Sequence, residues 1–446
     1  MKKSISILAI VLGGLLPAPA NDIVPAGAQA GPILLTGGTI HPVSSAPFEG
    51  FVLFEKGKIS NLGRAEVKPA LQKGTRVVNL AGKHVYPGMI AANTVLGLTE
   101  IRAVRATVDM TEPGAINPNV RAEVAVDADS ELLPVARSNG VLHALSVPRT
   151  RGLIAGTSAL MALDGWTWEK MTVRAPVGMH VSWPRFVDPA RARNADSKKS
   201  MEKSKKESEA ERRRLEESFA KARAYLAAKA ADEATQKTDL RWEAMAPVLA
   251  GEVPIFVHAD HLKQITDAVA FANKEGIKMV LVGRGDVWRA ADLLKSHDIP
   301  VIISGVNELP GRRWENYDTP MRLPLVLHEA GVRFCIAGNG SSMSAAHERN
   351  LPYEAARAAA FGLPKEVALK AVTLYPAQIL GAGDRLGSLE VGKEATLMIT
   401  SGDPLEITTA IESAFISGRE IDLANKQTKL YDKYREKYRQ LGEARR

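Results

Sequence analysis

The stretch VPIFVHADHLKQITDAVAFANKEGIKMVLVG, residues 253–283, contains the pattern that decides the fold. It begins and ends with apolar runs rich in β-branched residues, and between them apolar residues recur every three or four positions, as on one face of a helix. A strand, a helix and a strand in this order form a parallel unit whose strands are buried on both faces. The stretch therefore predicts part of an α/β domain.

The same alternation continues on both sides of this stretch. Further strand-like runs are GVLHALSV (140–147), IPVIIS (299–304) and VRFCIAG (332–338), and a helical stretch, VWRAADLLKSHD, lies at 287–298. Over residues 87–384 the pattern predicts a (β/α)8 TIM-like barrel with insertions. A doubly wound open sheet is the alternative.

Short strands and glycine-rich turns mark both ends of the chain. They are typical of residues 31–86, and the same texture returns at residues 385–425. Because one short region alone makes a poor core, we expect the two regions to pair into a small composite β-sandwich.

One segment inside the barrel region is strongly charged. Residues 191–239 are dense in Lys, Glu, Arg and Ala, and Leu215, Phe219 and Ala222 fall on one helical stripe. This pattern predicts a charged helical insertion, which either overhangs the barrel mouth or forms a hairpin without function.

The last residues, 426–446, also follow a helical period. Leu430, Tyr434, Tyr438 and Leu441 recur at helical spacing among Lys and Arg residues. We expect a C-terminal helix that docks by its aromatic face.

The N-terminus predicts export. Lys2 and Lys3 precede an apolar run, and Ala18-Pro19-Ala20 supplies the small residues that a signal peptidase needs. We therefore expect a signal peptide over residues 1–20, or 1–30 if cleavage follows Ala30, and a periplasmic or secreted protein. The run is too short to span a bilayer, so no membrane contact is expected after cleavage. An uncleaved N-terminal anchor is the alternative.

Charge and cysteine content narrow the function classes. The net charge of +8 is a mild excess, and no basic motif interleaved with aromatic residues suggests nucleic acid. The single cysteine, Cys335, excludes an internal disulfide and lies in an apolar run, where a buried thiol is the ordinary interpretation.

Several ordered motifs together resemble one known family. They are PGMI at 87–90, RNLPYEAARAAAFGLP at 349–364, AVTLYPAQILG at 371–381 and RLGSLEVGKEATLMI at 385–399. These motifs resemble the amidohydrolase superfamily, in its imidazolonepropionase-like and prolidase-like branch. The resemblance covers nearly the whole chain and implies a metal-dependent hydrolase of C–N bonds.

The family's first-strand motif has two histidines that bind a divalent metal, and this sequence departs from it. The corresponding positions hold Asn93 and Val95. An amide oxygen is a weak zinc ligand and an isopropyl group is none. Asn93 is then a candidate substrate-binding residue, or it bonds a neighbouring strand or loop.

The resemblance also assigns ligands on later strands. His258 matches the fifth-strand histidine and is the best candidate metal ligand. His261 is a second candidate, and a histidine on a helix surface is the alternative interpretation. Asp260 is expected to cap the following helix. Arg284 stands near the missing sixth-strand histidine, where it binds substrate or forms a surface ion pair.

Two further positions carry the family's catalytic groups. The eighth-strand aspartate aligns with Asn339, whose amide cannot accept a proton at neutral pH. His180 lies where many relatives have a metal-bridging lysine, and Thr157 lies in a glycine-rich loop that can hold a ligand oxygen. We therefore take Asn339 and His180 as catalytic candidates and Thr157 as a substrate-binding one.

Two functions are open on these residues. The first is hydrolysis of C–N bonds in an amide, imide or peptide, with one divalent metal such as zinc held weakly. The second is a catalytically reduced barrel that binds no metal and recognises a small molecule or a protein partner. Neither function excludes a homo-oligomer.

Overall fold

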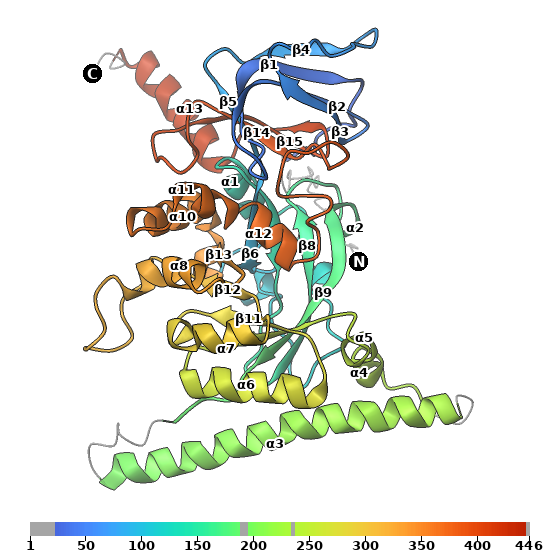
Figure 1. Cartoon of the computed structure of the whole chain (residues 1–446), viewed down its shortest axis with the longest axis vertical. Coiled ribbons are helices and arrows are strands. Elements are labelled where there is room, and N and C mark those ends of the chain that lie inside the picture. The colour runs from blue at the N-terminus through green and yellow to red at the C-terminus, as the bar shows by residue number, and fades with distance from the viewer. Residues whose placement is uncertain (1–22, 188–194, 233–236, 443–446) are drawn as a thin grey trace, which may run out of the picture.

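The computed structural model describes residues 23–187, 195–232 and 237–442. The predicted signal peptide, residues 1–20, lies outside this part of the chain. A sheet lies at one end of the molecule, an α/β barrel in the middle and one long helix across the other end (Figure 1). Among the described helices, none is both long and apolar enough to cross a membrane.

Eight strands form the barrel sheet, which confirms the predicted fold class. In chain order they are β6 (Met89–Thr94), β7 (Val141–Ser146), β8 (Ile154–Ala162), β9 (Thr172–Ser182), β10 (Ile255–His258), β11 (Met279–Gly283), β12 (Val301–Ser304) and β13 (Phe334–Ala337). Each is hydrogen-bonded to its sequence neighbour, and β13 also contacts β6, so the barrel is nearly closed.

One strand of the barrel runs against the others. β8 is antiparallel to both β7 and β9, whereas all other neighbouring pairs are parallel. Its connections are short, and an antiparallel strand needs no crossover helix. As a result, the loop between β7 and β8 lies at the same barrel end as the carboxyl ends of the parallel strands.

Helices cover the barrel where the strands are parallel. The longer ones are α1 (Leu132–Arg137), α6 (Leu262–Glu275), α7 (Ala291–Ser296), α8 (Thr319–Glu329), α10 (Leu351–Ala360), α11 (Lys365–Lys370) and α12 (Leu374–Ile379). The shorter turns are η1 (Arg105–Thr107), η2 (Ala122–Ala125), α2 (Trp168–Met171), α4 (Leu240–Glu243), α5 (Ala246–Leu249), η4 (Val287–Ala290), α9 (Ser342–Ala345) and η5 (Glu348–Asn350).

The barrel interior is mainly apolar below its mouth. Ile90, Phe256 and Cys335 belong to one buried cluster. At the amino ends of the strands, this cluster is covered by Ala377 of α12 and by Leu380, which follows that helix. Burial raises the pKa of the Cys335 thiol, so this cysteine packs as an apolar residue, as predicted. Buried polar side chains are not confined to the mouth, because His143 of β7, which pairs in register with Ile90, is 1% exposed and neither of its ring nitrogens has a hydrogen-bond partner among the described residues.

Strands from both chain ends share the second sheet. They are β1 (Ile33–Ile40), β2 (Phe48–Glu55), β3 (Lys58–Arg64), β4 (Arg76–Asn79), β5 (His84–Pro87), β14 (Leu397–Thr400), β15 (Ile411–Ile416) and β16 (Arg419–Ile421). β14 pairs with β5, which leads directly into β6. Leu35, Phe54 and Phe415 lie in its core, where the two phenyl rings meet edge to face. This junction fixes the start of the barrel.

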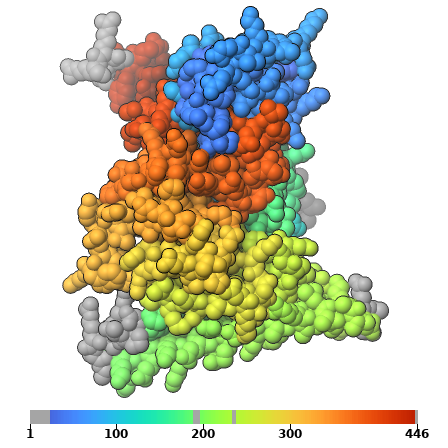
Figure 2. All heavy atoms as spheres, in the orientation of Figure 1, coloured from blue at the N-terminus to red at the C-terminus, as the bar shows by residue number. Residues whose placement is uncertain are grey.

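The charged segment contains a 37-residue helix, α3 (Ala195–Ala231), which crosses one end of the molecule (Figures 1 and 2). Its stripe of Leu215, Phe219 and Ala222 is fully buried. Phe219 meets Phe271 of α6 edge to face at 5.1 Å, so the second half of α3 is anchored to the barrel.

The predicted docking of the C-terminal helix is wrong. α13 (Lys426–Gln440) forms, capped by Asn425, but Tyr434 and Tyr438 are 50% and 47% exposed and no residue of the helix is buried. The ammonium group of Lys437 lies over both rings. The helix covers its aromatic face with its own cations instead of packing it on the barrel.

Candidate functional site

Polar side chains gather at the barrel mouth, where the carboxyl ends of the parallel strands meet. Asn93 comes from β6, His180 from β9 and His258 from β10, and Arg149 comes from the loop that joins β7 to β8. This is the barrel end at which active sites of such folds are built.

The two histidines bond directly to each other. β9 and β10 are neighbours, and His180 Nδ1 lies 2.9 Å from His258 Nε2. His180 is 1% exposed, and its Nε2 has no hydrogen-bond partner among the described residues. Burial and the charge of Arg149 lower the pKa of His258 to about 3, and burial lowers that of His180 well below its usual value. Both rings are therefore neutral at neutral pH.

Asn93 uses both ends of its amide to hold the mouth together. Its Nδ2 donates to the carbonyl oxygen of Gly338, 3.0 Å away, and its Oδ1 accepts from Arg149 Nη2 at 2.8 Å. The side chain is 2% exposed. Of the two interpretations made from the sequence, the structure shows the bond to a neighbouring segment.

Arg149 is a residue that the sequence did not single out. Burial lowers the pKa of its guanidinium to about 10, and the charge still persists at neutral pH. A Cβ atom on Gly340 would come within 1.6 Å of Arg149 Nη2, and Gly340 has φ +67°, so a glycine here makes room for the guanidinium. The mouth thus has a fixed positive charge.

Glu348 is the second residue that the sequence missed. It begins η5, is 3% exposed and has an unpartnered Oε1 within the described part of the chain. Burial raises the pKa of its carboxyl to about 8, against the opposing effects of Thr94 and Arg149. The charge of Glu348 in turn acts to raise the pKa of Arg149, so the two buried groups are electrostatically coupled.

Val95 and Asn339 lie apart from the two histidines. Val95 is fully buried in the apolar layer outside the strands. Asn339 is exposed after β13, where its Oδ1 accepts from the backbone of Ser341 and its Nδ2 reaches Glu308 at 3.4 Å. The structure does not bring these aligned positions together into a ligand set.

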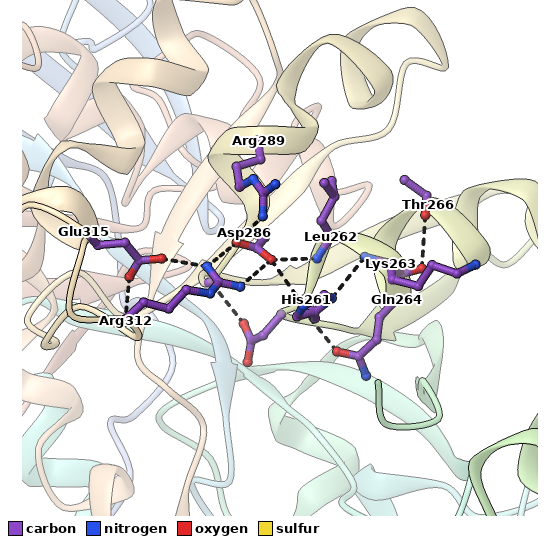
Figure 3. Close-up of polar contacts among 11 residues, drawn as sticks. His261, Leu262, Lys263, Gln264, Thr266, Asp286, Arg289, Arg312 and Glu315 are labelled. Carbon is purple, nitrogen blue, oxygen red and sulfur yellow. Dashed lines mark hydrogen bonds and ion pairs between the residues drawn. The ribbon is translucent and has the colours of Figure 1, made fainter. Parts of the chain in front are cut away.

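A separate network surrounds Asp286, in the loop after β11 (Figure 3). Arg312 donates to both of its carboxylate oxygens at 2.6 and 2.7 Å, and the backbone N–H of Leu262 donates at 2.9 Å. Asp286 is 0% exposed and its pKa is lowered, because these hydrogen bonds outweigh its burial. The network joins the β11 loop to the start of α6.

His261 belongs to this second network. Its Nδ1 accepts from the backbone of Lys263, and Gln264 returns a bond to the backbone N–H of His261, so this histidine caps α6. The expectation that Asp260 caps the helix is wrong, because Asp260 accepts from the backbone of Arg284 and Gly285 instead. Both residues precede the helix in the sequence, and this position alone did not identify which of their side chains bonds the backbone N–H groups at the helix start.

The two remaining candidates are held by local contacts. Arg284 pairs with Glu308 at 2.6 Å and donates to Ser304. Thr157, on β8, is buried beneath the segment at Val120, whose carbonyl oxygen accepts from its hydroxyl at 3.3 Å. Neither lies beside the histidine pair in the described contacts.

Cavities adjoin the loop that carries Arg149. One of about 830 Å³ is lined by Thr150 and Ser182 from the mouth and by Met201 and Ser204 from α3. Another of about 580 Å³ lies beside Pro148. The first half of α3 therefore overhangs the mouth, which was one of the two alternatives.

Comparison with known proteins agrees with this architecture. The model of the Amidohydrolase family matches residues 169–421. The chain belongs to the amidohydrolase family.

One curated protein is similar to part of the chain at low sequence identity. An amidohydrolase, tasK, from Hapsidospora irregularis is 24% identical over 198 residues, which cover 40% of this chain and 18% of that protein. The chain thus spans less than a fifth of that curated relative.

Solved structures extend the likeness over most of the chain. An amidohydrolase from Thermotoga maritima has a TM-score of 0.76 at 24% identity, covering 87% of this chain and 99% of its own. A zinc-bound adenosine deaminase from Xanthomonas campestris has a TM-score of 0.51 at 17% identity, covering 94% and 100%. At these identities the likeness establishes the fold.

Proposed function

We propose that the barrel mouth of this amidohydrolase-family chain binds a small molecule with an amide, imide or peptide group, and does so without a divalent metal held at the family positions. The observation that supports this best is the bond from the Arg149 guanidinium to Asn93 Oδ1. A cation already lies against the side chain that aligns with a metal ligand.

The side chains at the mouth are also poor ligands for a divalent metal. A zinc site needs three or four strong ligands, and the mouth offers two imidazoles that bond each other. Val95 packs outside the strands, and Asn93 is engaged at both ends of its amide. In the described ranges, no three His, Cys, Asp or Glu side chains are placed to hold a metal ion. The residues present do not fit the metal of the family.

Metal analysis of the purified chain tests this proposal. We expect far less than one equivalent of zinc, manganese or nickel per chain after growth without chelators, and no loss of metal in His258→Ala. Glu209→Ala, on the exposed side of α3, is the control. One tightly held equivalent that disappears in His258→Ala alone would overturn the proposal.

Hydrolysis of a C–N bond without metal is the second candidate function. It is favoured by the neutral pair of His180 and His258 near a guanidinium, because an imidazole can accept a proton from water while a cation stabilises the oxyanion. It ranks second because a pKa of about 3 makes His258 a weak base. Turnover of N-acyl amino acids or dipeptides that persists in EDTA and fails in His258→Ala would favour it.

We also infer export, with cleavage after Ala20. Contacts of the residues just beyond that point favour this cleavage point over the one after Ala30: the backbone of Ala26 donates to Asp164, and Gln29 bonds the backbone of Gly31, Phe54 and Gly57. Cleavage after Ala30 would remove these bonds. Mass spectrometry of the native protein should give an N-terminus at Asn21, and recovery of Met1 in the mature fraction would rule export out.

A further inference from the structure

The C-terminal helix α13 exposes large side chains to solvent. It lies at the edge of the molecule, at the same end as the second sheet (Figure 1). Tyr431, Tyr434 and Tyr438 are 65%, 50% and 47% exposed, and no residue of the helix is buried. Most helical stability in proteins comes from packing one face against a partner. A face as exposed as this one is available to a partner outside the chain.

The large side chains of α13 share one face of the helix. With 3.6 residues per turn, an arc of roughly 100° contains Leu430, Tyr431, Tyr434, Tyr438 and Leu441. A tyrosine has an apolar ring and a polar hydroxyl, so it is favoured at the boundary between water and lipid. We call these five residues the tyrosine face.

Basic residues border the tyrosine face, and the acidic residues lie away from it. The helix contains six Lys and Arg residues and two acidic ones. Lys437 follows one side of the face, and its ammonium group lies over two of the rings. Arg435 follows the other side, over the ring of Tyr431. The helical period puts both acidic residues, Asp432 and Glu436, on the opposite side of the helix.

A negatively charged surface complements this arrangement, whereas a second copy of the helix does not. Two copies joined by their tyrosine faces would bring their bordering cations together, and like charges across an interface are unfavourable. Asp432 pairs with Arg435 and Glu436 with Arg439, but these ion pairs are exposed and contribute little. Lipid phosphates can therefore bind the cations while the rings enter the headgroup region.

We propose that α13 binds an anionic phospholipid membrane and lies flat on it, with the tyrosine face toward the lipid. The proposal departs from the expectation of no membrane contact, which rested on the short N-terminal run. A helix that lies on a bilayer needs no apolar stretch long enough to span it. The inference is independent of what binds at the barrel mouth.

Sedimentation with lipid vesicles tests the inference on the full chain. We expect binding to vesicles of equal parts phosphatidylglycerol and phosphatidylcholine to be at least about tenfold tighter than binding to phosphatidylcholine alone. Salt at about 0.5 M should release the protein, because it screens exposed charges. A chain that ends at Asn425 should bind neither kind of vesicle. All proteins compared have the same N-terminus, so the apolar run after Lys3 cannot account for a difference.

Two pairs of substitutions separate the rings from the charges. Tyr434→Ser with Tyr438→Ser keeps every charge of the helix, and Lys433→Gln with Lys437→Gln keeps every ring. Each pair should weaken binding to the anionic vesicles about tenfold, since surface binding depends on both buried apolar area and attraction to anionic lipid.

The matched control removes the same charge from another exposed helix. Lys203→Gln with Lys205→Gln, in the first half of α3, should bind the vesicles as the wild type does. Thermal unfolding of all α13 variants should match the wild type, because the helix has no buried residue. Undiminished binding by the chain that ends at Asn425, or equal binding to both kinds of vesicle, would overturn the inference. A dimer in analytical ultracentrifugation that this truncation abolishes would also overturn it, because a second copy would then cover the tyrosine face.

Discussion

Two arginines at the barrel mouth have opposite surroundings. Arg312 donates to both oxygens of the fully buried Asp286 and pairs with Glu315. Arg149, across the mouth, bonds a neutral amide and leaves its Nε unsatisfied. The Arg312 arrangement joins two segments of the fold, whereas the Arg149 arrangement leaves guanidinium N–H groups without a partner in the described chain. We interpret the Asp286 network as structural and the Arg149 region as the ligand site.

Removing Asp286 should have the largest effect on stability. Asp286→Ala leaves Arg312 and the N–H of Leu262 without their partner, so we expect a loss of about 3–5 kcal/mol in the free energy of unfolding. Urea denaturation measures it. The control Glu209→Ala removes an exposed pair with Lys205 and should cost less than about 1 kcal/mol. A loss below 1 kcal/mol in Asp286→Ala would contradict the structural role.

Removing the charge of Arg149 should raise the free energy of unfolding instead of lowering it. Arg149→Met takes an unpaired cation out of the mouth, so the ligand-free protein should gain about 1 kcal/mol, even though Asn93 loses a bond. The same change at Arg312 should destabilise. If both substitutions lower the urea midpoint equally, the two arginines do not differ as described here.

The pH dependence of stability should report on Glu348. Its folded pKa is about 8, above the unfolded value, so the native state holds a proton that the unfolded state has released between these values. Stability of the wild type should therefore fall relative to Glu348→Gln as pH rises from about 5 to about 8. Both proteins contain the same histidines, whose lowered pKa values act in the other direction below about pH 6.5. A constant difference between the two proteins would mean that Glu348 titrates normally.

The smallest effect is expected at the C-terminal helix. Because α13 has no buried residue, deletion from Lys426 onward should change the free energy of unfolding by less than about 1 kcal/mol. Thermal unfolding followed by circular dichroism checks this. A drop of many degrees would show that the helix has a partner, such as a second copy of the chain.

The fold could be predicted because it depends on the spacing of hydrophobic residues and on the order of strands and helices along the chain. The alternation over residues 253–283 identified β10, α6 and β11, and the texture of the two chain ends identified the shared sheet. The antiparallel β8 was not predicted, since a buried strand has the same composition in either direction.

The candidate site was predicted only in part. His180 and His258 were named from separate strands, and neighbouring strands bring them to 2.9 Å. Arg149 lies in a loop and Glu348 begins the short turn η5, where a charged residue ordinarily indicates solvent, and the burial of both depends on contacts with distant segments. The run PRTRG at 148–152 gave no local signal that its first arginine turns inward.

A crystal structure of the protein soaked with N-acetylglycine and zinc tests the central claim most directly. The account predicts density for the amide at the barrel mouth beside Arg149, and no zinc between His180 and His258. Zinc bound to both histidines, with no density for the amide at the mouth, would contradict it.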